Sequence, residues 1–282
     1  MNLFHETDTE KTFSVLSLNA TDMVMEMQKK HKLSGEGAKT LGELLMAAAL
    51  FSTNLLQDET VTLTAEGLSN GATAVAIADS EGRVRGFYDE AEDQKIKAIP
   101  MLKVMRRAGL SEPRMSFCAL EPNSIAKSLQ EYYRACEQTD VLCRMETKFS
   151  KDFEQVDFAG AVLFVSWTRS QSDEGESVKA ALKTVLLPKF LKANGVKSPL
   201  EKAIPDMDFL RRDEKEIKFQ CNCSLERMET ALQSIGEAAL SELLEDEFTE
   251  IECKFCRHKY LFSKESVEVL LEELRKSKQT ES

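Results

Sequence analysis

The sequence predicts an α+β protein with a large N-terminal domain, a helical linker and a small C-terminal domain. Three observations predict this class. Residues 40–56 are apolar on nearly every side of a helix, and the segments after them alternate as strands do. A polar, proline-containing stretch follows residue 170. Four of the seven cysteines lie after residue 220, in a segment too short to bury a large core.

The predicted central helix has the sequence "TLGELLMAAALFSTNLL", residues 40–56. Thr40 and Glu43 have the spacing of a capping box, so we expect the helix to begin there. A helix without a polar stripe must be covered on more than one side. We therefore expect it to be buried between β-sheets.

The rest of the N-terminal domain, residues 1–170, is predicted to be strands with one further helix. "TVTLTAEG", "ATAVAIADS" and "RVRGFYDE" alternate in polarity and are separated by glycine-containing breaks, which predicts an antiparallel meander. "PNSIAKSLQEYYRACEQ" predicts a capped amphipathic helix. Strands over 141–149 and 158–167 complete the domain.

The linker, residues 171–218, is predicted to consist of broken helices. It contains three prolines and several apolar residues, and apolar residues need a packing partner, so we expect a docked but marginally stable region. The prolines are Pro188, Pro199 and Pro205, and the apolar residues are Leu186, Leu187, Phe190, Leu191, Phe209 and Leu210.

The composition excludes some classes of partner. A net charge of −11 opposes binding to nucleic acid or to an anionic membrane, since both require a basic surface. The longest apolar run, residues 44–51, is far shorter than a membrane span. The N-terminal residues lack the basic start and apolar run of a secretory signal, so we expect a cytoplasmic protein with reduced cysteines.

The C-terminal domain, residues 219–282, contains two cysteine pairs. Cys221 and Cys223 are one residue apart, Cys253 and Cys256 are two apart, and the segment between the pairs is long enough for a helix and a returning strand. Four thiolates form a closed tetrahedral site that suits Zn²⁺ in a structural role. The pattern leaves open whether the site is a structural clip, a redox device or both.

The other candidate residues near and outside this site are assigned simpler roles. His258 follows the second pair and is an alternative ligand, although four sulfurs already complete the site. Cys118, Cys136 and Cys143 are scattered, and we expect ordinary thiols there. Helices are expected to begin after Ser224 and Ser263, each of which can cap a helix. The apolar positions of the first helix are Leu225, Met228, Leu232, Ile235, Leu240, Leu243 and Leu244, and those of the second are Val267, Leu270, Leu271 and Leu274.

The motifs "FQCNCSLERM" and "IECKFCRHKYLFS" resemble the C-terminal signature of the redox-regulated thirty-three-kilodalton chaperonin family, the HslO heat-shock holdases. "LGELLMAAALFSTNLL", "VTLTAEG", "GRVRGFY" and "YYRACEQT" resemble segments of the family's first domain, so the resemblance covers most of the chain.

The resemblance implies a protein that is not an enzyme and that binds unfolding clients without ATP under oxidative or heat stress. It implies that the reduced form holds zinc and that oxidation expels it, with disulfides Cys221–Cys223 and Cys253–Cys256. The linker would then unfold and expose apolar surface, and the oxidised form would be a homodimer. The N-terminal domain would bind clients and mediate dimerisation.

The sequence departs from the family in its linker. Only 32 residues separate Pro188 from Cys221 (221 − 188 − 1), fewer than in typical members, and "TVLLPKF" lacks the usual glutamine before the leucine and proline. The glycine-rich turn after the first strands is altered to "GLSNG". A constitutive holdase with a purely structural zinc site is therefore the main alternative.

Three other classes fit less well. A zinc-ribbon nucleic-acid binder is opposed by residues 219–260, which contain four Lys or Arg against nine Asp or Glu. A thiol oxidoreductase would explain Cys253 and Cys256, but no βαβ pattern precedes them. A hydrolase lacks its usual nucleophile and metal motifs.

Overall fold

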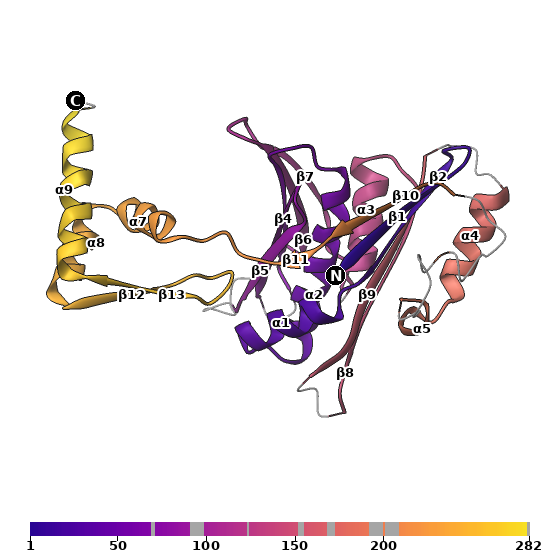
Figure 1. Cartoon of the computed structure of the whole chain (residues 1–282), viewed down its shortest axis with the longest axis horizontal. Coiled ribbons are helices and arrows are strands. Elements are labelled where there is room, and N and C mark those ends of the chain that lie inside the picture. The colour runs from indigo at the N-terminus through magenta and orange to yellow at the C-terminus, as the bar shows by residue number, and fades with distance from the viewer. Residues whose placement is uncertain are drawn as a thin grey trace. The chain divides into compact units, whose positions relative to one another are not determined.

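The chain divides into two compact units, Met1–Gln220 and Cys221–Ser282, and each is described by itself. The structure is a computed structural model that describes residues 1–68, 71–90, 99–122, 124–151, 155–167, 173–191, 200 and 209–280 (Figure 1). No helix in the described ranges has both the length and the apolar character that crossing a membrane requires.

The first unit contains an antiparallel five-stranded sheet. Its strand order is β10-β1-β2-β9-β8. β9 is buried along most of its length because the sheet is covered on both faces. The strands are β1 (Asn2–Asp8), β2 (Phe13–Asn19), β8 (Val141–Phe149), β9 (Val156–Ser166) and β10 (Phe209–Glu216).

The second sheet of this unit has six strands in the order β11-β5-β4-β3-β6-β7. β3, β4 and β5 are consecutive and antiparallel, as the alternating sequences predicted, and their buried residues alternate with half-exposed ones. The strands are β3 (Glu59–Glu66), β4 (Thr73–Asp79), β5 (Arg83–Asp89), β6 (Met101–Ala108), β7 (Arg114–Ala119) and β11 (Lys218–Phe219).

Helix α2 (Gly35–Phe51) lies between the two sheets, as predicted. It packs on β3, β4 and β5 from one side and on β2, β8 and β9 from the other. Gly86 in β5 permits this approach, because an added Cβ would lie 3.0 Å from Leu41 and Leu45. The central helix and the sheet faces around it form the main core.

The predicted start of this helix is wrong. Helix α2 begins at Gly35 after an extended Ser34, so Thr40 lies inside the helix. Ala38 and Leu41 are fully buried, which shows that the apolar pattern extends over the earlier turn. A short 3-10 turn, Ser52–Asn54, replaces the predicted last turn.

Two further helices flank the central one. α3 (Ile125–Cys136) is the predicted amphipathic helix, and its N-terminal cap is Ser124, whose Oγ accepts a hydrogen bond from the Lys127 N–H. It packs on α2 and on strands β7 and β8. α1 (Thr21–His31) packs on β9 and α2.

The part of the chain predicted to be a linker begins with two helices, α4 (Asp173–Thr184) and α5 (Leu187–Leu191). They cover the face of the five-stranded sheet opposite α2 (Figure 1). Leu187, Phe190 and Leu191 are buried there, whereas Leu186 is exposed. The docking expected of these apolar residues is thus observed, except at Leu186.

The end of this region is a strand, where helical structure was expected. β10 pairs with β1 along its whole length, and β11 then joins the edge of the six-stranded sheet in parallel with β5. Edge strands tolerate the charged sequence "RRDEKE" because one side of the strand faces no partner. The side chains of Phe209 and Leu210, and Pro199 and Pro205, lie outside what the structure describes.

The second unit combines helices of different lengths with a two-stranded hairpin around a small core of its own. Ser224 and Ser263 both cap helices with their hydroxyl oxygens, as expected. The single long helix expected after Ser224 is instead two helices, because Gly236 adopts φ +93° between them. The elements are α7 (Leu225–Ser234), α8 (Glu237–Glu242), a 3-10 turn Leu243–Glu245, β12 (Phe248–Glu252), β13 (Lys259–Ser263) and α9 (Lys264–Thr280).

Candidate metal centre

Two chain segments of the second unit deliver the four cysteines. Cys221 and Cys223 lie in the extended segment before α7, and Cys253 and Cys256 lie in the turn that connects β12 with β13. The turn is fixed by two backbone hydrogen bonds, from Cys253 N–H to the His258 carbonyl (2.9 Å) and from Arg257 N–H to the Cys253 carbonyl (2.8 Å). Arg257 adopts φ +60° to close it.

The four sulfur atoms all lie within 4.8 Å of one another. Cys221 Sγ is 3.8 Å from Cys253 Sγ, and Cys223 Sγ is 3.4 Å from Cys256 Sγ. Four sulfurs bound tetrahedrally to Zn²⁺ at about 2.3 Å would be about 3.8 Å apart. The four thiols are free, so the arrangement fits a tetrathiolate metal site.

The site is partly open to solvent. Cys253 is buried, and the other three cysteines are partly exposed. Small oxidants can therefore reach sulfur, which a deeply buried structural site would prevent.

The thiols differ in acidity. Burial raises the pKa of Cys256 to about 11, and burial also raises that of Cys221. Burial opposes ionisation of Cys223 too, but hydrogen bonds from Tyr260 and the neighbouring thiols outweigh it and lower its pKa. Of these three thiols, Cys223 is the one whose surroundings favour the thiolate.

Tyr260 is a residue of this site that the sequence reasoning missed. Its hydroxyl donates a hydrogen bond to Cys223 Sγ over 3.1 Å. Its position on the strand directly after the second cysteine pair was the available signal. His258 is not among the clustered metal-binding groups, and its ring meets the Tyr260 ring edge-on at 4.7 Å.

The three remaining cysteines do not join this cluster. Cys143 is buried, and burial raises its pKa. Cys118 and Cys136 donate weak hydrogen bonds to the backbone carbonyls of Ser128 and Phe117, both at 3.5 Å. Their surroundings agree with the expectation of ordinary thiols.

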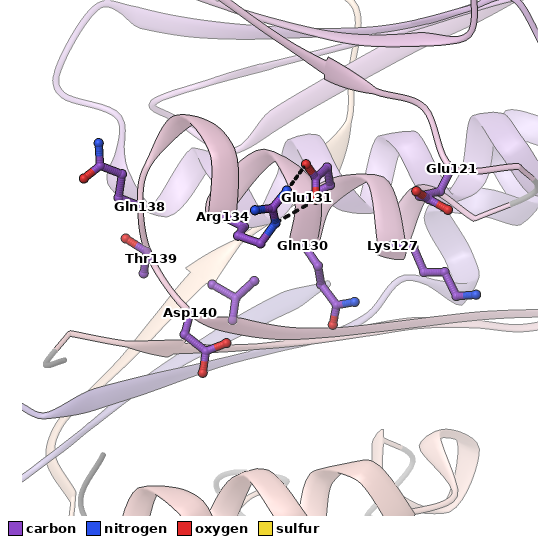
Figure 2. A pocket seen from close by; sticks show the side chains of 9 residues that line it. Glu121, Lys127, Gln130, Glu131, Arg134, Gln138, Thr139 and Asp140 are labelled. Carbon is purple, nitrogen blue, oxygen red and sulfur yellow. Dashed lines mark hydrogen bonds and ion pairs between the residues drawn. The ribbon is translucent and has the colours of Figure 1, made fainter. Parts of the chain in front are cut away.

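The first unit has a polar hollow of about 640 Å³ beside α3 (Figure 2). Figure 2 shows Arg134 turned toward Glu131, and their closest atoms are 2.6 Å apart. Asp140 at its rim pairs with Lys179. Glu131, Arg134 and Asp140 thus have ion-pair partners, and the described lining of the hollow contains no cysteine or histidine.

A second cavity of about 720 Å³ lies beside the start of α2, and Glu43 lines it. This carboxyl is almost fully buried, so desolvation raises its pKa to about 7, against the opposing effects of Lys39 and the Ile125 N–H. The sequence contains a signal for this burial, since Glu43 is a charged residue within an otherwise apolar helix. The capping role predicted for Glu43 is wrong, because the helix begins at Gly35.

Comparison with known proteins decides the family. The family model described as Hsp33 protein matches residues 3–263. The chain belongs to the Hsp33 family. Its resemblance to the thirty-three-kilodalton chaperonins is thereby confirmed.

Relatives of the family are similar along nearly the whole chain. A "33 kDa chaperonin" of Lactococcus lactis subsp. cremoris is 26% identical over 274 residues, covering 92% of this chain and 95% of the relative. One from Clostridioides difficile is 28% identical, covering 89% and 91%. The crystal structure of the 33 kDa chaperonin (heat shock protein 33 homolog) from Thermotoga maritima superposes with a TM-score of 0.83 at 25% identity, covering 96% and 98%.

Proposed function

We propose that the protein is a redox-regulated, ATP-independent chaperone that binds unfolding proteins. The observation that carries the proposal is the convergence of Cys221, Cys223, Cys253 and Cys256 on one point in a member of the Hsp33 family. The proposed ligands of Zn²⁺ are these four cysteines. No catalytic activity is proposed.

The chain's own residues account for the inactive form. The core of the second unit, which is the third core of the molecule, is small, so a unit of this size gains little stability from burial alone. Its buried residues are Leu232, Leu240, Phe262, Val267, Leu270 and Leu271. Bound zinc would supply folding free energy, about 10–16 kcal/mol at neutral pH for small structural sites. The turn at Cys253–Arg257 and the segment before α7 hold the thiols in place for it.

Oxidation would dismantle the site in two balanced steps. A thiolate sulfur attacks one oxygen of a peroxide, the O–O bond breaks, and a sulfenic acid and hydroxide form. The neighbouring thiolate then attacks the sulfenic sulfur and displaces hydroxide, which leaves a disulfide. The proposed products are Cys221–Cys223 and Cys253–Cys256, and the metal loses its ligands.

The proposed client surface is the sheet face beneath α4 and α5. These helices pack on Phe13, Val15 and Phe164 of the sheet and form with them a second core, separate from the main one. Their removal would expose a contiguous apolar face of the kind that captures unfolded chains. Residues 171–218 would thus act as the releasable linker, residues 1–170 as the client-binding and dimerisation domain, and residues 219–282 as the redox switch.

The proposed partners follow from this surface. They are unfolded or partly folded client proteins and, in the oxidised form, a second copy of the chain. A cytoplasmic location is proposed because free thiols persist in reducing compartments. Nucleic acid and membranes are not proposed partners, since the chain carries a net charge of −11.

Peroxide treatment tests the regulated function. Zinc release is followed with a coloured chelator, and aggregation of a heat-unfolding client is followed by light scattering. As zinc is released, the protein should increasingly suppress this aggregation. The variant Cys143→Ser is the control, because that thiol lies outside the cluster. The fully reduced, zinc-loaded protein could instead protect the client already, with no increase after peroxide. That result would support a constitutive holdase.

The constitutive holdase remains a second candidate because the region between Pro188 and Cys221 is short. A shorter linker has fewer residues to release. Against this candidate, α4 and α5 cover the apolar sheet face in the form of the protein described here.

A further inference from the structure

Tyr260 connects the core of the second unit to one particular sulfur. The residue lies on β13, opposite Ile251 on β12, and its half-buried ring packs against the third core. Its hydroxyl reaches Cys223 Sγ at 3.1 Å. The hydrogen bonds found in the described part of the chain give Cys253 and Cys256 no such hydroxyl donor.

A hydroxyl donor changes the chemistry of the sulfur that it contacts. A hydrogen bond that an O–H group donates to a thiolate stabilises the negative charge and withdraws electron density from the sulfur. A thiolate stabilised in this way is a weaker nucleophile toward a peroxide. The same hydrogen bond fixes the orientation of the sulfur. Losing a residue that hydrogen-bonds to a metal ligand typically lowers metal affinity about 10–100-fold.

We infer that Tyr260 is a positioning residue that holds Cys223 in its metal-binding orientation and protects its sulfur from oxidation. The inference rests on the proposed redox function and adds a cause for a difference between the two cysteine pairs. The Cys253–Cys256 pair lacks this protection and reacts first. The Cys221–Cys223 pair becomes reactive when the hydroxyl withdraws.

The position of the ring determines when the hydroxyl withdraws. Phe262 on the same strand is buried in the third core with Val267 and Leu271 of α9. Tyr260 therefore keeps its hydroxyl on Cys223 while β13 remains docked on that core. Local unfolding of the hairpin removes the hydrogen bond. Oxidation of the Cys221–Cys223 pair therefore depends on unfolding of this unit as well as on the oxidant.

The test is the full-length variant Tyr260→Phe, which keeps the ring and deletes the hydroxyl. Tyr88→Phe deletes a tyrosine hydroxyl in the other unit and serves as the matched control. Far-ultraviolet circular dichroism at the assay temperature establishes that both variants are folded. Each protein is loaded with Co²⁺ for spectroscopy and with Zn²⁺ for affinity and oxidation measurements.

Three results are expected of Tyr260→Phe and none of Tyr88→Phe. The sulfur-to-cobalt charge-transfer band moves to lower energy, because the sulfur holds its electrons less tightly. Zinc affinity falls about 10-fold or more. In a peroxide time course with disulfides mapped by mass spectrometry, the Cys221–Cys223 bond forms several-fold faster, whereas the rate for Cys253–Cys256 is unchanged.

The inference is overturned if the charge-transfer band and the zinc affinity of Tyr260→Phe stay at their wild-type values. An unchanged rate of Cys221–Cys223 disulfide formation in this variant also overturns it. Wild-type protein that forms no disulfide in peroxide contradicts the proposed function instead. In that case the band position and the zinc affinity still decide whether Tyr260 acts on the sulfur.

Discussion

Each of the four clustered cysteines supplies one sulfur, so the loss of any one leaves a site with three. Serine is a poor ligand for zinc in such a site. We expect Cys221→Ser, Cys223→Ser, Cys253→Ser and Cys256→Ser each to lower zinc content well below one per chain and to loosen the second unit. Elemental analysis of the purified variants measures this.

The matched control is Cys136→Ser, because that thiol is exposed and lies outside the cluster. It should retain full zinc content. X-ray absorption that detects nitrogen or oxygen in the first coordination shell would contradict the all-cysteine site.

Glu43 gives the molecule a pH-dependent stability. Its pKa is about 7 in the folded chain against an ordinary value of 4.5, and the main cause is burial. A raised pKa means that the stabilising, protonated state is fully present below pH 4.5 and is lost as the pH rises through 7. Glu43→Gln should therefore stabilise the protein at pH 8, by up to about 3 kcal/mol, with little effect at pH 4.5.

Chemical denaturation at the two pH values measures this difference. Glu36→Gln on the same helix is the control, since that residue is less buried than Glu43. A wild-type advantage over Glu43→Gln at pH 8 would show that the charged carboxylate stabilises the fold.

At the residue scale, the sequence predicted that the four cysteines come together, because their spacing is itself the signal. It could not predict the contact of Tyr260 with Cys223 or the burial of Glu43. The Tyr260 hydroxyl meets Cys223 only because β13 returns beside the first cysteine pair, and this contact joins residues 37 positions apart.

Among the secondary-structure elements, the two cysteine segments should differ in their ease of oxidation. The Cys253–Cys256 turn spans four residues, so its Cα atoms can approach to about 7 Å, near the upper limit for a disulfide. Cys221 and Cys223 flank one residue, and their disulfide closes a small, strained ring. We expect the Cys253–Cys256 bond to appear first in a peroxide time course, and mass mapping that finds the reverse order would refute this.

Helices α4 and α5 should control access to the apolar sheet face. Phe190 is buried against that face, so Phe190→Ala should weaken docking by about 3–5 kcal/mol. We expect this variant to bind a hydrophobic dye and to protect a client partly even when reduced. The control Leu186→Ala should do neither, because Leu186 is 60% exposed.

Predictions for the elements succeeded where the apolar pattern was strong. α2, α3 and the β3–β5 meander have clear periodicity, and all three were predicted. β10 was not, because an edge strand with the sequence "FLRRDEKE" shows no alternation of apolar residues. Its structure depends on pairing with β1, about 200 residues earlier in the chain, which no local pattern records.

At the scale of the whole molecule, client capture should depend on apolar surface. The net charge of −11 gives no attraction to acidic or neutral clients. Binding of an unfolded client by the oxidised protein should therefore survive 1 M salt, in which the Debye length is only about 3 Å. Light scattering at low and high salt tests this, and loss of protection at moderate salt would indicate electrostatic binding.

The most direct test of the central claim follows zinc and client protection in the same sample. Zinc-loaded, reduced protein is treated with peroxide at a temperature that destabilises the second unit, while chelator absorbance and client light scattering are recorded together. The account predicts one zinc released per chain, with protection rising as zinc is lost. Protection that is complete before any zinc is released, or zinc release with no gain in protection, would contradict it.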